Sequence, residues 1–161
     1  MRRVGPPILI AIGLSTTSGS SAAPVQFVDR TSAAGLLTPQ SLGADSERET
    51  MTGGAAARDI DGDGWVDLII TRLDANPIFY RNRGDGTFED ASTGSGIVMP
   101  TGSNGAAWGD IDNDGDPDLY LTRADFTSEA TGTHRMFVNQ GDGMFREETL
   151  ARGVAAGIAT D

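Results

Sequence analysis

An internal repeat is the feature that most restricts the fold of this chain. The segment GGAAARDIDGDGWVDLIITR at 53–72 matches NGAAWGDIDNDGDPDLYLTR at 104–123. A second segment, FYRNRGDGTFEDASTGSGI at 79–97, recurs as FVNQGDGMFREETLARGV at 137–154, after a short insertion near 126–134. A period of roughly 50 residues is typical of proteins that stack one supersecondary unit on the next. We therefore expect two copies of one unit, packed against each other.

The end of this unit occurs a third time, near the N-terminus. FVDRTSAAGL at 27–36 shares with FEDASTGSGI and FREETLARGV a Phe, an acid, a hydroxyl residue and a Gly followed by an aliphatic residue. We interpret 23–50 as a closing strand and linker, because an N-terminal strand can complete the last unit of a ring. The full units are expected at 51–100 and 101–155, and 156–161 as the start of a truncated third.

Each unit divides into four short runs that are rich in strand formers or small residues. Gly-Asp-Gly at 84–86 and at 141–143 joins the last two runs, and Asp-Gly between apolar runs is a strong hairpin signal. No long window shows helical periodicity. The expected class is all-β, with four-stranded antiparallel blades of a β-propeller. The expected strands are 54–60, 66–72, 77–82 and 87–92, then 105–111, 117–123, 134–139 and 144–149.

The link between the first two runs of each unit is an acidic loop with the pattern D-x-D-x-D-G-x-x-D. Converging carboxylates repel one another unless a cation lies among them. Oxygen ligands in such number suit Ca²⁺ better than Mg²⁺, and the glycine at position six allows a sharp turn. An EF-hand needs Glu at position twelve, where this chain has Ile70 and Leu121 inside apolar strands. We therefore predict a calcium loop on a β-hairpin, with one Ca²⁺ in each of the two loops.

The predicted ligands are the carboxylates at positions one, three, five and nine and the carbonyl at position seven. In the first loop they are Asp59, Asp61, Asp63, Trp65 (carbonyl) and Asp67. In the second they are Asp110, Asp112, Asp114, Asp116 (carbonyl) and Asp118. We predict no catalytic residue and no other cofactor.

Composition restricts partners and compartment. The 23 acidic and 12 basic residues give a net charge of −11, which argues against binding nucleic acid or anionic membranes. The chain has no cysteine, so ions rather than disulfides would have to staple its loops. Arg2 and Arg3, followed by the apolar run at 8–14, predict a signal peptide at 1–22 with cleavage before Ala23. That run is too short to span a bilayer. We expect a secreted, periplasmic or extracellular protein.

The motifs GAAARDIDGDGWVDL and GAAWGDIDNDGDPDL, each followed by N-x-G-D-G-x-F, resemble FG-GAP/VCBS repeats over residues 27–161. That resemblance implies the propeller of integrin α-chain heads and of secreted bacterial proteins, here about two of an expected seven blades. It also implies calcium in the hairpin loop of each blade. The added segment that begins at each Phe resembles the cartilage acidic protein and UnbV-type group. The resemblance is specific for fold and calcium loops, not for one activity.

Other features admit competing interpretations. Arg83-Gly84-Asp85 spells an adhesion tripeptide, but the second unit has Gln140 at the first position, so the Gly-Asp is explained by the turn. His134, the chain's single histidine, has no partner for a catalytic triad. Trp65 and Trp108 suit packing between blades better than a ligand platform. The recurring acids at 89–90 and 147–148 suit a structural role better than a glycosidase pair.

The leading hypothesis is a secreted calcium-binding propeller module that binds a protein or glycan, as in adhesion, without catalysis. The alternative is the non-catalytic part of an extracellular hydrolase or lyase with its active site further along the chain. A third possibility is a fragment without activity of its own.

Overall fold

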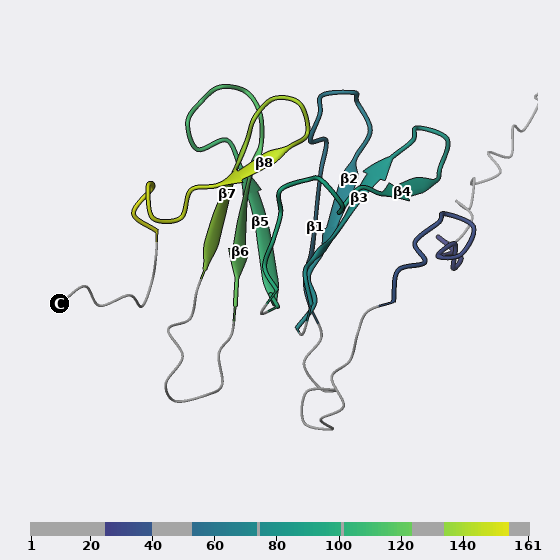
Figure 1. Cartoon of the computed structure of the whole chain (residues 1–161). Helices are drawn as coiled ribbons and strands as arrows, with labels where there is room; N and C mark the ends of the chain where they lie inside the picture. The colour runs from purple at the N-terminus through teal and green to yellow at the C-terminus, as the bar shows by residue number, and fades with distance from the viewer. Residues whose placement is uncertain (1–24, 40–52, 74, 101, 124–133, 155–161) are drawn as a thin grey trace, which may run out of the picture.

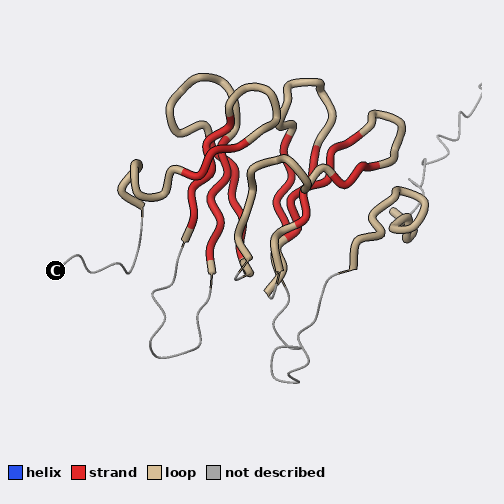
Figure 2. Tube along the Cα trace, viewed as in Figure 1, coloured by secondary structure: helices blue, strands red, loops and turns tan. Residues whose placement is uncertain are grey.

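The computed structural model describes residues 25–39, 53–73, 75–100, 102–123 and 134–154. The predicted signal peptide at 1–22, the segment 156–161 and most of the insertion near 126–134 lie outside these residues. Within the described ranges every regular element is a strand and none is a helix (Figure 2). It follows that this part of the chain contains no helix that could cross a membrane.

The strands form two separate four-stranded antiparallel sheets, each in simple sequential order. The first sheet contains β1 (Ala55–Arg58), β2 (Asp67–Ile70), β3 (Ile78–Asn82) and β4 (Phe88–Asp90). The second contains β5 (Gly105–Gly109), β6 (Asp118–Thr122), β7 (Arg135–Asn139) and β8 (Phe145–Glu147). The predicted all-β class and the two propeller-like blades are confirmed. The strands are shorter than predicted, and β1 and β5 end just before Asp59 and Asp110, which accept hydrogen bonds from loop amides.

The two blades meet along their first strands, β1 and β5, which lie side by side (Figure 1). Both strands are built mainly of Gly and Ala. At the entry to β1 the backbones come close, since a Cβ added to Gly54 would lie 2.9 Å from the carbonyl oxygen of Asn104. Small residues are therefore needed where the blades converge.

One apolar core fills the space between the blades. Its buried members come from both sheets, from the first acidic loop and from the segment that joins the sheets: Ile60, Ile69, Phe79, Ile97, Met99, Leu119, Leu121, Phe137 and Phe145. The rings of Phe79 and Phe145 meet edge to face, with centroids 6.2 Å apart, and Trp108 lies 5.9 Å from Phe145. Trp108 thus packs against the shared core, whereas Trp65 is 51% exposed. Because the core is shared, each blade completes the other.

The repeated tail of each unit docks on the outer strand of the next. The amide of Phe145 donates a hydrogen bond to the carbonyl of Ser95 at 2.7 Å, and the amide of Phe88 donates to the carbonyl of Ala34 at 2.8 Å. Residues 31–36 therefore take the same place on the first blade that 92–97 take on the second. This position explains the third copy of the tail. Residues 27–30 have no strand partner in the described ranges, so ring closure by this segment stays a prediction.

Candidate metal centres

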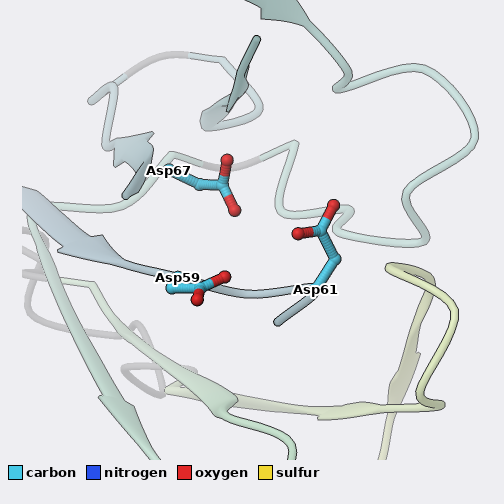
Figure 3. Close-up of side chains that lie close together, drawn as sticks. All are labelled: Asp59, Asp61 and Asp67. Carbon is cyan, nitrogen blue, oxygen red and sulfur yellow. The ribbon is translucent and has the colours of Figure 1, made fainter. Parts of the chain in front are cut away.

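The loop between β1 and β2 brings three carboxylates together. Asp59, Asp61 and Asp67 each place one oxygen so that all of these atoms lie within 4.8 Å of one another. Figure 3 shows the three side chains pointing toward a common space. Asp59 and Asp61 leave the end of β1, and Asp67 begins β2, so the strand pairing itself fixes the spacing.

The loop between β5 and β6 repeats this arrangement. Asp110, Asp112 and Asp118 also place carboxylate oxygens within 4.8 Å of one another. Both loops lie at the same end of the two sheets (Figure 1). Three converging carboxylates form a hard, anionic donor set that fits a divalent cation such as Ca²⁺. Each of these loops could therefore hold one metal ion.

The ninth-position aspartates are buried and tied to backbone. Asp67 is fully buried and accepts hydrogen bonds from the amides of Ile60, at 3.1 Å, and Asn82, at 2.7 Å. Asp118 is 1% exposed and accepts the matching bonds from Ile111, at 2.9 Å, and Asn139, at 2.8 Å. These bonds orient both carboxylates within their loops, which lowers the cost of organising the site around an ion.

The ionised form of these two aspartates is costly without a cation. Burial raises the pKa of Asp67 above its ordinary value, and the nearby charges of Asp61 and Asp63 add to the effect. Burial likewise raises the pKa of Asp118, and the nearby charges of Asp112 and Asp114 add to the effect. Backbone hydrogen bonds oppose but do not cancel these effects. A divalent cation would supply the missing opposite charge.

The rest of each loop is folded by hydrogen bonds from its own amides. Asp59 accepts from Gly62 at 2.9 Å and from Gly64 at 3.0 Å, and Asp110 accepts from Gly115 at 3.2 Å. Gly64 and Gly115 have φ values of 90° and 100°, a region that side chains disfavour. The sharp turn expected at position six is present in both loops.

Two of the predicted ligand positions lie outside the three-carboxylate clusters. At position five, Asp63 accepts a hydrogen bond from the amide of Trp65 at 2.8 Å, and Asp114 accepts from the amide of Asp116 at 3.0 Å. These acids cap the turn. Their coordination of an ion, and that by the carbonyls of Trp65 and Asp116, stays a prediction.

Arginine pairs with the third-position acid in both loops. Arg81 on β3 lies with Nε 3.2 Å from an oxygen of Asp61. Arg152, in the turn after β8, lies with one terminal nitrogen 2.8 Å from an oxygen of Asp112. Each arginine places one positive charge at the edge of its acidic loop. Sequence reasoning missed these contacts because the arginines stand at different places in the two units.

Two asparagines at the end of the third strands were also missed as functional residues. Besides the amide bonds to Asp67 and Asp118, the Asn82 side chain donates to the carbonyl of Val66 at 2.9 Å, and the Asn139 side chain donates to that of Pro117 at 3.3 Å. The side-chain oxygens of both accept from the hairpin glycine two residues on. Both asparagines stand first in the repeated motif N-x-G-D-G-x-F, which was the available sequence signal. They were not predicted because the search for metal ligands considered carboxylates and not amide side chains.

The competing features have structural partners. Arg83 forms an ion pair with Glu89 at 2.7 Å, and Asp85 accepts hydrogen bonds from both the amide and the hydroxyl of Thr87. The Arg83-Gly84-Asp85 tripeptide is thus part of the β3–β4 hairpin. The ring of His134 stacks on Tyr120 with centroids 5.8 Å apart.

Comparison with known families agrees with this architecture. Residues 59–121 match the model of the FG-GAP-like repeat family. The match begins at the first acid of the first loop and ends within β6, so it spans both acidic loops. No curated protein matches the chain. This segment, which contains β2 to β5 and most of β6, is therefore similar to an FG-GAP-like repeat.

Proposed function

We propose that this protein is a secreted, calcium-binding β-propeller module that recognises a protein or a glycan and catalyses no reaction. The observation that carries the calcium proposal is the repetition of one three-carboxylate cluster at matching places in two blades. A solvated acidic turn would not need its ninth-position acid buried, yet Asp67 and Asp118 are both buried. Repetition and burial together favour a structural ion in each blade.

Calcium is favoured over magnesium by the ligand set. The loops offer several carboxylates and a backbone carbonyl within one short turn, and Ca²⁺ accepts six to eight oxygen ligands in flexible geometry. Mg²⁺ keeps several waters and rarely uses such a cage. In a chain without cysteine, an ion that joins the first two strands of each blade would take the stapling role of a disulfide.

Thermal unfolding with and without a chelator tests the calcium proposal. An ion that binds only the folded chain stabilises it by about 2.7 kcal/mol at a hundredfold excess over Kd. Titration calorimetry should show two Ca²⁺ per chain in the wild type and one in Asp61→Asn. Asp85→Asn removes a charge from a hairpin outside the clusters and should leave two. Equal melting temperatures with calcium and with chelator would refute the proposal.

Export and recognition are proposed from the sequence and from the stabilisation that calcium would give outside the cell. Expression in a bacterial host, followed by N-terminal sequencing of the exported chain, should find Ala23 as the first residue. A chain retaining Met1 in the cytoplasm would contradict export. Binding to arrayed glycans and extracellular proteins in calcium, lost in chelator, is the expected result for recognition. Equally strong binding in calcium and in chelator would show that recognition does not depend on the ions.

A further inference from the structure

A hydrogen-bonded path joins the two candidate metal centres through Asn139. Its side-chain Nδ2 donates to the carbonyl of Ile60 in the first loop at 3.2 Å. The amide of the same Ile60 donates to Asp67, and the amide of Asn139 donates to Asp118. Three hydrogen bonds, linked by the covalent bonds of Ile60 and Asn139, thus connect Asp67 with Asp118.

The path runs through buried atoms. Ile60 is 1% exposed and Asn139 is 2% exposed. Hydrogen bonds shielded from water are electrostatically stronger than exposed ones. Ile60 also stands between Asp59 and Asp61 in the chain, so a shift of its peptide groups moves both of these acids. Asn139 therefore touches the first loop at the residue that connects its carboxylates.

Asn82 provides the internal comparison. It has the same place at the end of β3, bonds to Asp67 and Val66 in its own blade, and makes no bond to the other sheet within the described ranges. Asn139 makes the equivalent bonds to Asp118 and Pro117 and adds the one to Ile60. The bond across the blades is thus the difference between two otherwise matched residues.

We propose that Asn139 couples the two loops, so that an ion bound in one raises the affinity of the other for its ion. This inference rests on the proposed calcium binding. An ion in the second loop fixes Asp118 and with it Asn139, which holds Ile60 and Asp67 in the arrangement that the first loop needs. Because coupling between binding sites is reciprocal, the effect runs equally in both directions. The expected coupling factor is at least about fivefold, the lower end of measured couplings.

Calcium titration calorimetry on the full chain measures this factor. Asp112→Asn and Asp61→Asn each leave one loop intact and give the affinities of the separate loops. The product of the two stepwise wild-type constants should exceed the product of these separate affinities by the coupling factor. A ratio of one or less would overturn the proposal. No binding in any of these chains would instead refute calcium binding itself, so the two failures are distinguishable.

Matched variants assign the coupling to Asn139. The Asn139→Ala substitution should bring the ratio of these two products to one. The Asn82→Ala substitution should keep the wild-type ratio, even if the calcium affinities themselves fall. To obtain the ratio for each asparagine variant, Asp61→Asn and Asp112→Asn are each combined with it and the calcium titrations are repeated. An unchanged ratio in folded Asn139→Ala would overturn the role of this residue.

A second measurement needs no change at Asn139. In Asp61→Asn, calcium fills only the second loop, and the amide resonance of Ile60 should shift as it does so. The matched probe is the amide of Ile111 in Asp112→Asn, which should shift as calcium fills the first loop. If both resonances stay fixed while calcium binds, the loops are independent and the proposal is wrong.

Discussion

The guanidinium of Arg152 lies 2.8 Å from the carboxylate of Asp112, across 40 residues of sequence. Arg81 makes the same kind of contact with Asp61 in the first loop. The two arginines are not repeats of each other, since Val138 and Ser95 stand at the places that match Arg81 and Arg152. Two unrelated positions thus supply one electrostatic contact, a positive charge on the third acid of the loop.

The first prediction concerns the competition between this arginine and a metal ion. Arg152→Gln removes a positive charge that neutralises Asp112 in the absence of metal. The metal-free chain should melt at a lower temperature, and the rise in Tm on adding calcium should be larger than in the wild type. Calcium affinity of the second loop should increase, by less than about tenfold because exposed charges interact weakly. Thermal melts and calorimetry with and without chelator measure these changes.

Arg146→Gln is the matched control, because Arg146 and Arg152 both pair with Glu148, whereas Arg146 contacts no loop acid within the described ranges. It should leave the calcium response at the wild-type value. A smaller calcium response in Arg152→Gln would show that the arginine chiefly orients Asp112 for the ion rather than competing with it.

The second prediction concerns the docking of one unit's tail on the next blade. Gly96 has a φ of 82°, and a Cβ added there would lie 2.0 Å from the carbonyl oxygen of Phe145. Gly96→Ala combines the left-handed penalty of about 1–2 kcal/mol with a backbone clash. The free energy of unfolding should fall by at least about 3 kcal/mol, measured by denaturant titration.

Gly153 is the same residue in the next copy of the tail, with a φ of 69° and nothing within 4 Å of an added Cβ. Gly153→Ala should therefore cost only about 1 kcal/mol. Equal losses in the two variants would mean that the tail does not dock on the outer strand as described.

The third prediction is a pH dependence from the acid of the repeated tail. Burial alone would raise the pKa of Asp90, but hydrogen bonds from Ser92 and Thr38 outweigh it and lower the pKa. A carboxylate with a lowered pKa in the folded state stabilises the fold above its unfolded pKa. That contribution is lost as the pH falls through the pKa of the folded state, which lies below the ordinary pKa of an aspartate.

The stability advantage of the wild type over Asp90→Asn should accordingly be present at neutral pH and shrink as the pH is lowered through and below the ordinary pKa of an aspartate. The effect should stay below about 1 kcal/mol because the site is largely exposed. Denaturant titrations of both chains in chelator measure it. A difference that is constant across this range would contradict the role of Asp90.

The sequence predicted the blades because each blade is a local structure. Strand order, the two hairpins at Gly-Asp-Gly and the turns at Gly64 and Gly115 depend on residues close in the chain, and the repeat doubled every signal. The docking of Gly96 under Phe145 was not foreseen, because it depends on contact between units. The sequence pattern of a single unit does not predict which strand of a neighbouring unit its tail will contact.

For the candidate sites, too, the sequence predicted the local arrangement but not the long-range contacts. Spacing alone predicted that Asp59, Asp61 and Asp67 and their copies converge, because the loop between paired strands is short. Periodicity could not reveal the contact of Arg152 with Asp112 or of Asn139 with Ile60, because each contact joins residues far apart in the chain. The side chains that connect the loops to the rest of the fold, such as Arg152 and Asn139, can be recognised only from the packed structure.

The last prediction separates turn strain from metal binding in the second loop. Asn113 has a φ of 61°, and Gly62 stands at the matching place with a φ of 73°. Asparagine tolerates this left-handed region better than other side chains, and glycine tolerates it best. Asn113→Ala should lower the free energy of unfolding by about 1 kcal/mol, and Asn113→Gly should leave it unchanged or slightly higher. Because the Asn113 side chain is not among the predicted ligands, both differences should be the same in calcium and in chelator. A loss in Asn113→Ala that appears only with calcium would instead make the Asn113 side chain part of the metal centre.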